Sequence, residues 1–386
     1  MGELVSADLF AEFAPSAYED WLAALRDSLA SADLESLVTR TAEGIRIHPL
    51  PHPEAYAASR LAGWLRGGRS NGGWQIAQEI NISEPRAFNR ALLDALANGQ
   101  TAVALDAGPR LQQSADLELA LAGINLAQYP VFAADAAVFD GLRATRSGPE
   151  MARLRGCIGS SSDDYIALAE RFSVVEAVSP ALGCVGINTV EQHANGADAA
   201  QELAFVLAAG AEVLRGLLGR GLAVDTVASR LHITLCIGED FFMQIAKFRA
   251  VKSLWAQMTR AFGASEAAQR IHLHARSGAR NKSQEPAHNN LLRLTCEALA
   301  AALAGIDSMT LAAFDAPADN EFSRRLSRNI QLILQHEAQI TRAIDPAGGS
   351  WHVEWLTDEL GRRAWAAFQR MESERRQQDP GWREVG

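Results

Sequence analysis

Two histidines separated by a single residue, His272 and His274, are the first candidates for chemistry in this sequence. Alternate residues of a β-strand point to the same side, so on a strand the two imidazoles would share one face and could bind a metal ion together. A metal site needs further ligands, and no cluster of carboxylates or histidines at the other predicted strand ends completes one. We therefore expect no metal site on this chain.

A glycine-rich segment, Asp345–Ser350 with the sequence DPAGGS, is a second candidate. Such a loop before a helix can bind a phosphate through its backbone N–H groups, or it can form a tight turn, and the sequence leaves both open. Glu239 and Asp240 follow a predicted strand, where TIM-barrel enzymes place catalytic side chains. Acidic residues also favour the first turn of a helix, and we prefer that interpretation.

The elements that must position these residues alternate after about residue 90 between short apolar runs, typical of buried parallel strands, and longer amphipathic helical stretches. Eight such strands in about 250 residues favour a (β/α)8 TIM barrel within the α/β class. The expected strands are Thr101–Asp106, Tyr129–Ala133, Leu154–Ile158, Gly183–Asn188, His232–Ile237, Ile271–Ala275, Ser308–Phe314 and Ile340–Ile344.

The first ninety residues differ from the rest, with an amphipathic helix near Tyr18–Ser31 followed by an extended arm rich in proline and glycine. An arm that is not compact by itself packs along another surface, and we expect it to wrap around a partner. The predicted organisation is an N-terminal helical and extended arm over 1–90, a barrel over 91–375, and a charged tail over 376–386.

Composition excludes several classes of function. The 386 residues carry a formal net charge of −10, and no long run of basic residues is present, which argues against nucleic-acid and anionic-membrane partners. No apolar signal region follows the acidic N-terminus, so we expect a cytoplasmic protein. The four cysteines lie far apart in apolar stretches, which predicts reduced thiols in the core.

Long segments resemble a known family. The sequences GEDFFMQIAKFRAVKSLWAQM, EPAHNNLLRLTCEALAAALAGIDSMTLAAFD and FSRRLSRNIQLILQHEAQITRAIDPAGGSWHVEWLTDEL are similar to consecutive segments of the methylmalonyl-CoA mutase barrel, and further matches keep the same order along nearly the whole chain. The resemblance implies a barrel that binds an acyl-CoA along its axis beneath adenosylcobalamin, whose radical chemistry rearranges the carbon skeleton. The family's cobalt-ligating Asp-x-His-x-x-Gly motif has no match here, and we expect no flavodoxin-like cobalamin-binding domain.

The resemblance also indicates where catalytic positions are substituted. Catalytic chains read Trp-Thr-x-Arg-Gln-Tyr where this chain reads WQIAQE, so Glu79 stands in place of the radical-triggering tyrosine and Ala77 in place of the arginine. After the fourth strand, Val190 and Glu191 replace a Tyr-His pair whose histidine polarises the substrate carbonyl. A carboxylate at such a position would also repel an anionic substrate.

We therefore expect no catalytic residue on this chain, only the residues of an eroded cavity. The expected lining residues are Gln78, Glu79, Glu191, Gln244, His274 and Arg276.

The pattern resembles the small subunit of heterodimeric mutases. It implies a non-catalytic barrel that pairs with and stabilises a catalytic large subunit, with adenosylcobalamin on that partner and no cofactor on this chain. Two alternatives stay open. One is an active mutase barrel that uses a separately encoded cobalamin-binding subunit, and the other is a metal-dependent hydrolase built on His272 and His274.

Overall fold

The computed structural model describes residues 17–29, 33–50, 73–105, 114–318 and 320–378. The chain divides into two compact units, Met1–Ala58 and Ser59–Gly386. In the described part of the smaller unit, helix α1 (Tyr18–Ser28) precedes a 3₁₀ turn, η1 (Leu34–Leu37), and a short antiparallel hairpin. Its two strands are β1 (Thr39–Arg40) and β2 (Arg46–Ile47).

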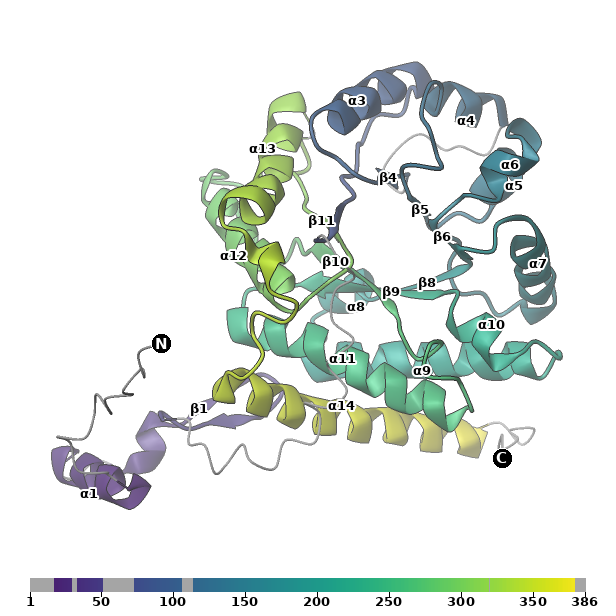
Figure 1. The fold of residues 1–386 in the computed structure, drawn as a ribbon. Coiled ribbons are helices and arrows are strands. Elements are labelled where there is room, and N and C mark those ends of the chain that lie inside the picture. Colours follow the sequence, from purple (N-terminus) through teal and green to yellow (C-terminus); the bar gives the residue numbers. More distant parts are fainter. Residues whose placement is uncertain (1–16, 30–32, 51–72, 106–113, 319, 379–386) are drawn as a thin grey trace, which may run out of the picture. The chain divides into compact units, whose positions relative to one another are not determined.

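The larger unit is built on parallel strands, which Figure 1 shows arranged around a common centre with the helices outside them. They form two sheets, with the orders β3-β11-β10-β9-β8 and β4-β5-β6-β7, and every pairing is parallel. The strands are β3 (Gln75–Ile76), β4 (Val103–Ala104), β5 (Val131–Ala133), β6 (Gly156–Ile158), β7 (Leu182–Gly183), β8 (Val185–Asn188), β9 (Leu231–Ile237), β10 (His272–Ser277) and β11 (Ser308–Thr310).

The two sheets approach each other at both of their edges. Strands β7 and β8 are consecutive in the chain and are separated only by Cys184, so they act as one interrupted strand. At the other edge, the backbone N–H groups of Thr101 and Ala102 both donate to the carbonyl of Ile76, at 3.1 Å. The result is a TIM-barrel-like arrangement of eight strand positions.

One expected strand is wrong, and one strand was missed. Ile340–Ile344, the expected last strand, contains the 3₁₀ turn η4 (Ile340–Arg342), and Ile344 is 65% exposed, so its apolar pattern does not face a core. The missing strand is β3, which hydrogen-bonds to β11. Consequently the barrel elements begin near Gln75, and the expected boundary between residues 90 and 91 falls within helix α3, a barrel helix.

The helices follow the strands in the alternating order that the sequence predicts. They are α3 (Pro85–Ala97), α4 (Ser114–Ala120), α5 (Ala137–Thr145), α6 (Gly148–Met151), α7 (Tyr165–Val178), α8 (Val190–Ala194), α9 (Ala199–Leu218), α10 (Val224–Ala228), α11 (Phe241–Ala261), α12 (Asn289–Leu303), α13 (Glu321–Leu332), a π-helical turn η3 (Ile333–Glu337) and α14 (Trp351–Gln378). The segment after residue 378, most of the expected charged tail, lies outside the described residues.

Helix α14 runs across the outer faces of α9 and α11 (Figure 1). A bidentate ion pair fixes it there, since the Arg215 guanidinium donates to both carboxylate oxygens of Glu372 at 2.6 and 3.0 Å. A second ion pair joins Arg375 to Glu212. None of the helices in the described part of the chain is both long and apolar enough to cross a membrane.

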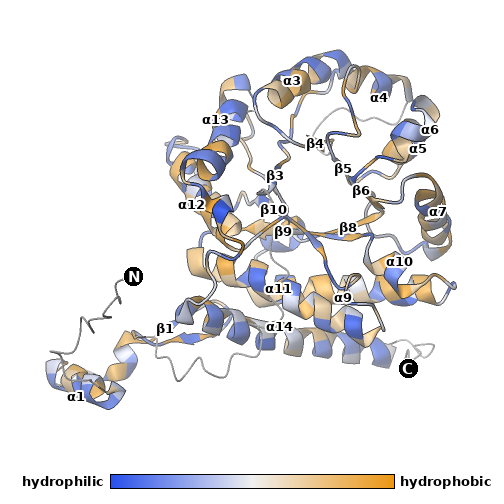
Figure 2. Ribbon diagram, in the orientation of Figure 1, coloured by the Kyte–Doolittle hydropathy of each residue, from blue (hydrophilic) through white to orange (hydrophobic). Residues whose placement is uncertain are grey.

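The core lies between the strands and the surrounding helices. On β9 and β10 alternate residues point outward into this layer, and Ile233, Leu235, Leu273 and Ala275 are completely buried there. Figure 2 shows β8 as hydrophobic along nearly its whole length, whereas the helices carry both hydrophobic and hydrophilic residues. The intervening residues of β9 and β10 face the barrel interior, and these carry the polar side chains.

Three of the four cysteines, Cys157, Cys184 and Cys236, are buried free thiols, as expected, whereas Cys296 is exposed on α12.

Candidate functional site in the barrel interior

A cavity of about 210 Å³ opens among the carboxyl ends of the strands. This is the end of a parallel barrel at which active sites are found. One wall is apolar and the other polar. The lining residues are Ala77, Glu79, Ala104, Phe132, Ala134, Asn188, Thr234, His274, Arg276 and Thr310.

An ion pair lies in the wall of this cavity, between the end of β3 and β10, which both flank β11. The Arg276 guanidinium, on β10, donates from Nε to Oε1 of Glu79 at 2.8 Å and from Nη2 to Oε2 at 2.7 Å. This parallel, two-bond geometry is the strongest arrangement available to an arginine and a carboxylate. The Glu79 side chain is 19% exposed and that of Arg276 33% exposed, so the pair is partly shielded from water.

Below the ion pair, three imidazoles occupy the barrel interior. His272 and His274 do share one face of β10, and both bond to the Ser308 hydroxyl, through Nε2 at 2.9 Å and Nδ1 at 2.7 Å. His232 of β9 stacks on His272 with ring centroids 4.4 Å apart. Phe132 contacts all three rings from β5. We call His232, His272, His274 and Ser308 the histidine layer.

The histidine layer is electrically neutral at ordinary pH. Burial lowers the pKa of His232 well below its usual value, and the neighbouring His272 and His274 add to the effect. Burial also lowers the pKa of His272, although Asp307 opposes this shift. For His274, burial followed by His272 and Arg276 lowers the pKa to about 3. These side chains are partly buried among the strands, and the loss of hydration there disfavours the charged forms.

A second cavity, of about 530 Å³, lies at the amino ends of the strands and includes Trp74, Gln75, Asp307 and the π-helical turn. His272 lines this lower cavity and His274 lines the upper one. Because both rings bond to Ser308, the histidine layer lies between the two cavities along the barrel axis.

The structure brings together three of the six expected lining residues, Glu79, His274 and Arg276. Gln78 does not line the cavity: it is 2% exposed, it donates to the Arg324 carbonyl, and its Oε1 accepts from Arg328.

The other two expected residues also lie away from the cavity lining. Gln244 is buried within α11, where its Oε1 has no hydrogen-bond partner among the described residues. Glu191 is exposed on the short helix α8, whose first residue is Val190.

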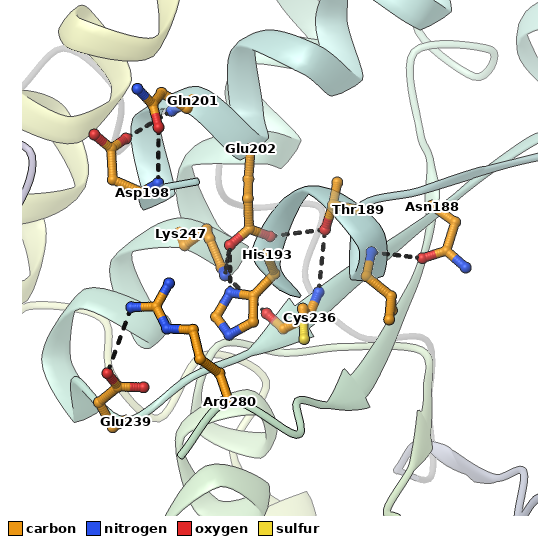
Figure 3. Close-up of polar contacts among 11 residues, drawn as sticks. Asn188, Thr189, His193, Asp198, Gln201, Glu202, Cys236, Glu239, Lys247 and Arg280 are labelled. Carbon is orange, nitrogen blue, oxygen red and sulfur yellow. Dashed lines mark hydrogen bonds and ion pairs between the residues drawn. The ribbon is translucent and has the colours of Figure 1, made fainter. Parts of the chain in front are cut away.

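A buried ionic cluster beside the barrel strands was not anticipated from the sequence (Figure 3). Oε1 of Glu202 accepts from the Lys247 ammonium at 3.0 Å and lies 2.9 Å from Nδ1 of His193, while Oε2 accepts from the Thr189 hydroxyl at 2.7 Å. Lys247 also donates to the carbonyl of Cys236 at 2.7 Å. A lysine inside the apolar stretch of α11 was the available signal, because such a charge needs a buried partner.

The Glu202 carboxylate stays ionised in this cluster. Burial alone would raise its pKa, but the Lys247 charge and the hydrogen bonds of His193 and Thr189 outweigh that effect and lower the pKa. The side chains of Glu202 and Lys247 are 1% and 0% exposed. Because each carboxylate oxygen of Glu202 faces a donor, the cluster connects α9, α11 and the end of β9 to one another.

The geometry of the Asp345–Ser350 loop favours the tight turn. Buried Arg249 pairs with Asp345 through one guanidinium nitrogen and with Glu354 through another, the latter at 2.7 Å. The Gly349 N–H, which a phosphate would need, donates to Glu354. Two carboxylates beside the loop would repel an anion.

The acidic residues after β9 also have structural roles. Asp240 caps α11 by accepting from the Met243 N–H at 3.1 Å, which agrees with the helix-turn interpretation. Glu239 lies 3.7 Å from Arg280 in an exposed ion pair. Within the described ranges, no group of three or more His, Cys, Asp or Glu side chains is arranged to hold a metal ion. The hydrolase hypothesis therefore lacks a ligand set there.

A parallel α/β barrel-like fold with a polar cavity at the carboxyl ends of its strands defines the class of this protein. Comparison with known proteins then gives the family: the methylmalonyl-CoA mutase family profile matches residues 149–375. The chain belongs to the methylmalonyl-CoA mutase family.

Relatives named as small subunits match nearly the whole chain. The methylmalonyl-CoA mutase small subunit of Porphyromonas gingivalis is 31% identical across 93% of this chain, and that of Streptomyces virginiae is 33% identical across 94%. The methylmalonyl-CoA mutase of Rhizobium meliloti is 39% identical across 50% of the chain and 28% of its own length. The chain spans 63% and 65% of the lengths of the two small subunits, less than two thirds of either.

Proposed function

We propose that this chain is a non-catalytic barrel subunit that pairs with a catalytic, adenosylcobalamin-dependent methylmalonyl-CoA mutase chain and stabilises it. The naming of two relatives as small subunits supports a subunit role. We also infer that the two sheets form one closed barrel, supported by the hydrogen bonds of Thr101 and Ala102 to Ile76.

The observation that carries the proposal is the ion pair between Glu79 and Arg276. By the family resemblance, Glu79 stands where catalytic chains have the radical-triggering tyrosine. A carboxylate held by two charge-assisted hydrogen bonds has no phenolic hydrogen to donate or abstract, so it cannot replace that tyrosine. Both members of the pair line the cavity, so a substrate entering along the axis would meet them there.

The ion pair changes the electrostatic argument made from the sequence. A lone Glu79 carboxylate would repel an anionic acyl group, but Arg276 cancels its charge to first order, so this repulsion is offset. What opposes substrate binding is then geometric: the cavity has a volume of only about 210 Å³, and the histidine layer lies beneath the ion pair.

The second substituted position supports the same conclusion. Glu191 and Val190 stand where the resemblance places the Tyr-His pair, and the exposed Glu191 side chain does not line the cavity. An ionised carboxylate accepts hydrogen bonds and has no hydrogen to donate to a substrate carbonyl, so the electrophilic assistance of the catalytic histidine has no replacement at this position.

Adenosylcobalamin belongs to the partner in this proposal. The cofactor supplies carbon radicals when its cobalt–carbon bond breaks. The cavity of about 210 Å³ lies below the roughly 300 Å³ at which pockets for drug-sized ligands begin, so it does not fit an enclosed corrinoid, and we derive no step through that group on this chain.

The test uses the full chain, alone and with a full-length catalytic mutase chain. We expect a one-to-one complex by size-exclusion chromatography with light scattering, and a catalytic chain that unfolds at a higher temperature in the complex, because a partner that binds only the folded state stabilises it. The lone chain should not convert methylmalonyl-CoA with adenosylcobalamin present.

The rival hypothesis, an active barrel with a separately encoded cobalamin-binding subunit, predicts a different outcome. Turnover by the lone chain plus such a small subunit, abolished in His274→Asn but kept in the surface variant His288→Asn, would establish the rival and overturn our proposal. His274 lines the cavity, whereas His288 is exposed at the start of α12.

A further inference from the structure

The turn between α8 and α9 contains an Asn-Gly dipeptide, Asn195–Gly196. In such a dipeptide the backbone nitrogen of the glycine can attack the asparagine side-chain carbonyl, because glycine has no Cβ to hinder the approach and permits the backbone rotation that the attack requires. The sequence holds two further Asn-Gly dipeptides, Asn98–Gly99 and Asn71–Gly72, of which the second lies outside the described residues. The surroundings of the two described dipeptides determine which of them can react in the folded chain.

The asparagine side chains of these two dipeptides are held differently. The Asn98 amide donates from Nδ2 to the backbone carbonyl of Asp94 at 2.8 Å and to the Asp94 Oδ1 at 3.0 Å. Asn195 is exposed, and its side chain makes no hydrogen bond to any residue in the described part of the chain. The side-chain carbonyl carbon of Asn195 is therefore free to turn toward a nucleophile, whereas that of Asn98 is kept in place.

The two glycines also differ in the space around them. A Cβ at Gly99 would lie 3.0 Å from the Leu332 side chain, whereas nothing lies within 4 Å of a Cβ placed at Gly196. Ring closure rotates the Asn195 backbone away from its ψ of 3° and breaks the bond from the Gly196 N–H to the His193 carbonyl. This bond ends a helix of only five residues, and such a helix end opens at a small cost relative to global unfolding.

We propose that Asn195 is a site of spontaneous deamidation. The Gly196 nitrogen loses its proton and bonds to Cγ of Asn195, the Cγ–Nδ2 bond breaks, and Nδ2 leaves with that proton as ammonia, so that a succinimide ring remains. Water then opens the ring, giving aspartate when it adds at Cγ and isoaspartate when it adds at the backbone carbonyl carbon. The inference is independent of the proposed function, because water is the only co-reactant.

The isoaspartate product changes the end of α8. It adds a carbon atom to the main chain, so the bonds from the Asn195 N–H to the Glu191 carbonyl at 2.9 Å and from the Gly196 N–H to the His193 carbonyl at 3.0 Å cannot both keep their geometry. Helix α8 also carries the His193 side chain, whose Nδ1 lies 2.9 Å from Glu202 in the buried ionic cluster (Figure 3). We therefore expect the modified chain to unfold at a lower temperature.

The test compares the folded chain with the chain unfolded in guanidinium chloride, both incubated at mildly alkaline pH. Peptide mapping by mass spectrometry, with fragmentation that separates aspartate from isoaspartate, gives the rate at each Asn-Gly dipeptide. In the unfolded chain Asn98 and Asn195 should react at similar rates. In the folded chain Asn195 should react at least about tenfold faster than Asn98, because Asn98 needs a larger opening of the structure. Equal rates at the two sites of the folded chain, or no reaction at Asn195 while the unfolded chain reacts, overturn the proposal.

Two variants test the consequence for α8. Asn195→Gln replaces the five-membered ring closure by a slower six-membered one, so this variant should keep its melting temperature during an incubation that lowers that of the wild type. The matched control is Asn98→Gln, at another exposed asparagine that ends a helix and precedes a glycine, and its melting temperature should fall as that of the wild type does. An equal fall in Asn195→Gln and the wild type, or a constant melting temperature after Asn195 has reacted, refutes the link to α8.

Discussion

The histidine layer should make the stability of this protein depend on pH in a window where few other groups titrate. Burial, with His272 and Arg276, lowers the pKa of His274 to about 3 in the folded chain, against an ordinary value of 6.5. Between these two pH values, the unfolded chain therefore binds a proton at His274 that the folded chain does not bind. As far as His274 is concerned, the free energy of unfolding is highest above pH 6.5 and decreases as the pH falls toward 3.

The magnitude follows from the two pKa values of His274. Between pH 7 and pH 5 its folded form stays neutral while its unfolded form becomes protonated, so the free energy of unfolding falls by about 2 kcal/mol. His232 and His272, whose pKa values are also lowered, contribute in the same direction. Carboxyl groups titrate mainly below this range, so the histidines dominate it.

The perturbation is His274→Asn. At pH 7 the variant should be less stable than the wild type by roughly 1 kcal/mol or more, because the bond to Ser308 is lost. At pH 5 the difference should have shifted in favour of the variant by about 2 kcal/mol, since asparagine has no proton to bind. Urea unfolding at pH 7, 6 and 5, extrapolated to water, measures both quantities.

The control is His288→Asn at an exposed position, which leaves the histidine layer intact. Its free energy of unfolding, plotted against pH, should run parallel to that of the wild type. If the wild-type and His274→Asn curves also run parallel from pH 7 to pH 5, then His274 is not held neutral and the account of the layer is refuted.

Two further predictions concern the packing around the barrel. Lys247→Met leaves the buried Glu202 carboxylate without its counter-charge and should lower the free energy of unfolding in urea by about 3–5 kcal/mol. Adding Glu202→Gln in a double variant should recover part of this loss. An unchanged urea midpoint for Lys247→Met contradicts the ionic cluster. Gly210→Ala places a Cβ about 2.4 Å from the Trp255 ring and should lower the free energy of unfolding by roughly 1–3 kcal/mol. Gly148→Ala is the control, because no atom lies within 4 Å of a Cβ placed there. Equal melting temperatures for the two variants would contradict this packing.

Most strands of the larger unit could be located from the sequence because buried parallel strands leave an apolar signature. His232–Ile237 and Ile271–Ala275 were placed almost correctly, at Leu231–Ile237 and His272–Ser277. β3 could not be found this way: it is two residues long, and a glutamine precedes its single isoleucine. Its position is set by pairing with β11, which is tertiary information that no local pattern contains.

The opposite error arose at Ile340–Ile344, where apolar residues at both ends of a short segment imitate a strand. Gln339 lies between the π-helical turn and the 3₁₀ turn η4, and its φ of +54°, in the left-handed region, turns the chain into that 3₁₀ turn. For a non-glycine residue such a conformation is enforced by surrounding structure, so periodicity alone could not reveal it.

The candidate site was half predictable for a similar reason. The family resemblance fixed the register, so Glu79, His274 and Arg276 were placed at the cavity. The sequence could not reveal that Glu79 and Arg276 neutralise each other, since they are 197 residues apart and meet only through the barrel. His232 was missed because its membership in the histidine layer depends on its register opposite His272.

The position of α14 has a consequence for how the chain is made. This helix covers the outer faces of α9 and α11, and its ion pair from Arg215 to Glu372 joins residues 157 positions apart. During synthesis from the N-terminus, α9 and α11 therefore leave the ribosome long before their cover exists. At about 5–20 residues per second, those faces stay exposed for roughly 10 to 30 seconds, the interval in which a chaperone, or an already folded subunit, would have to protect them.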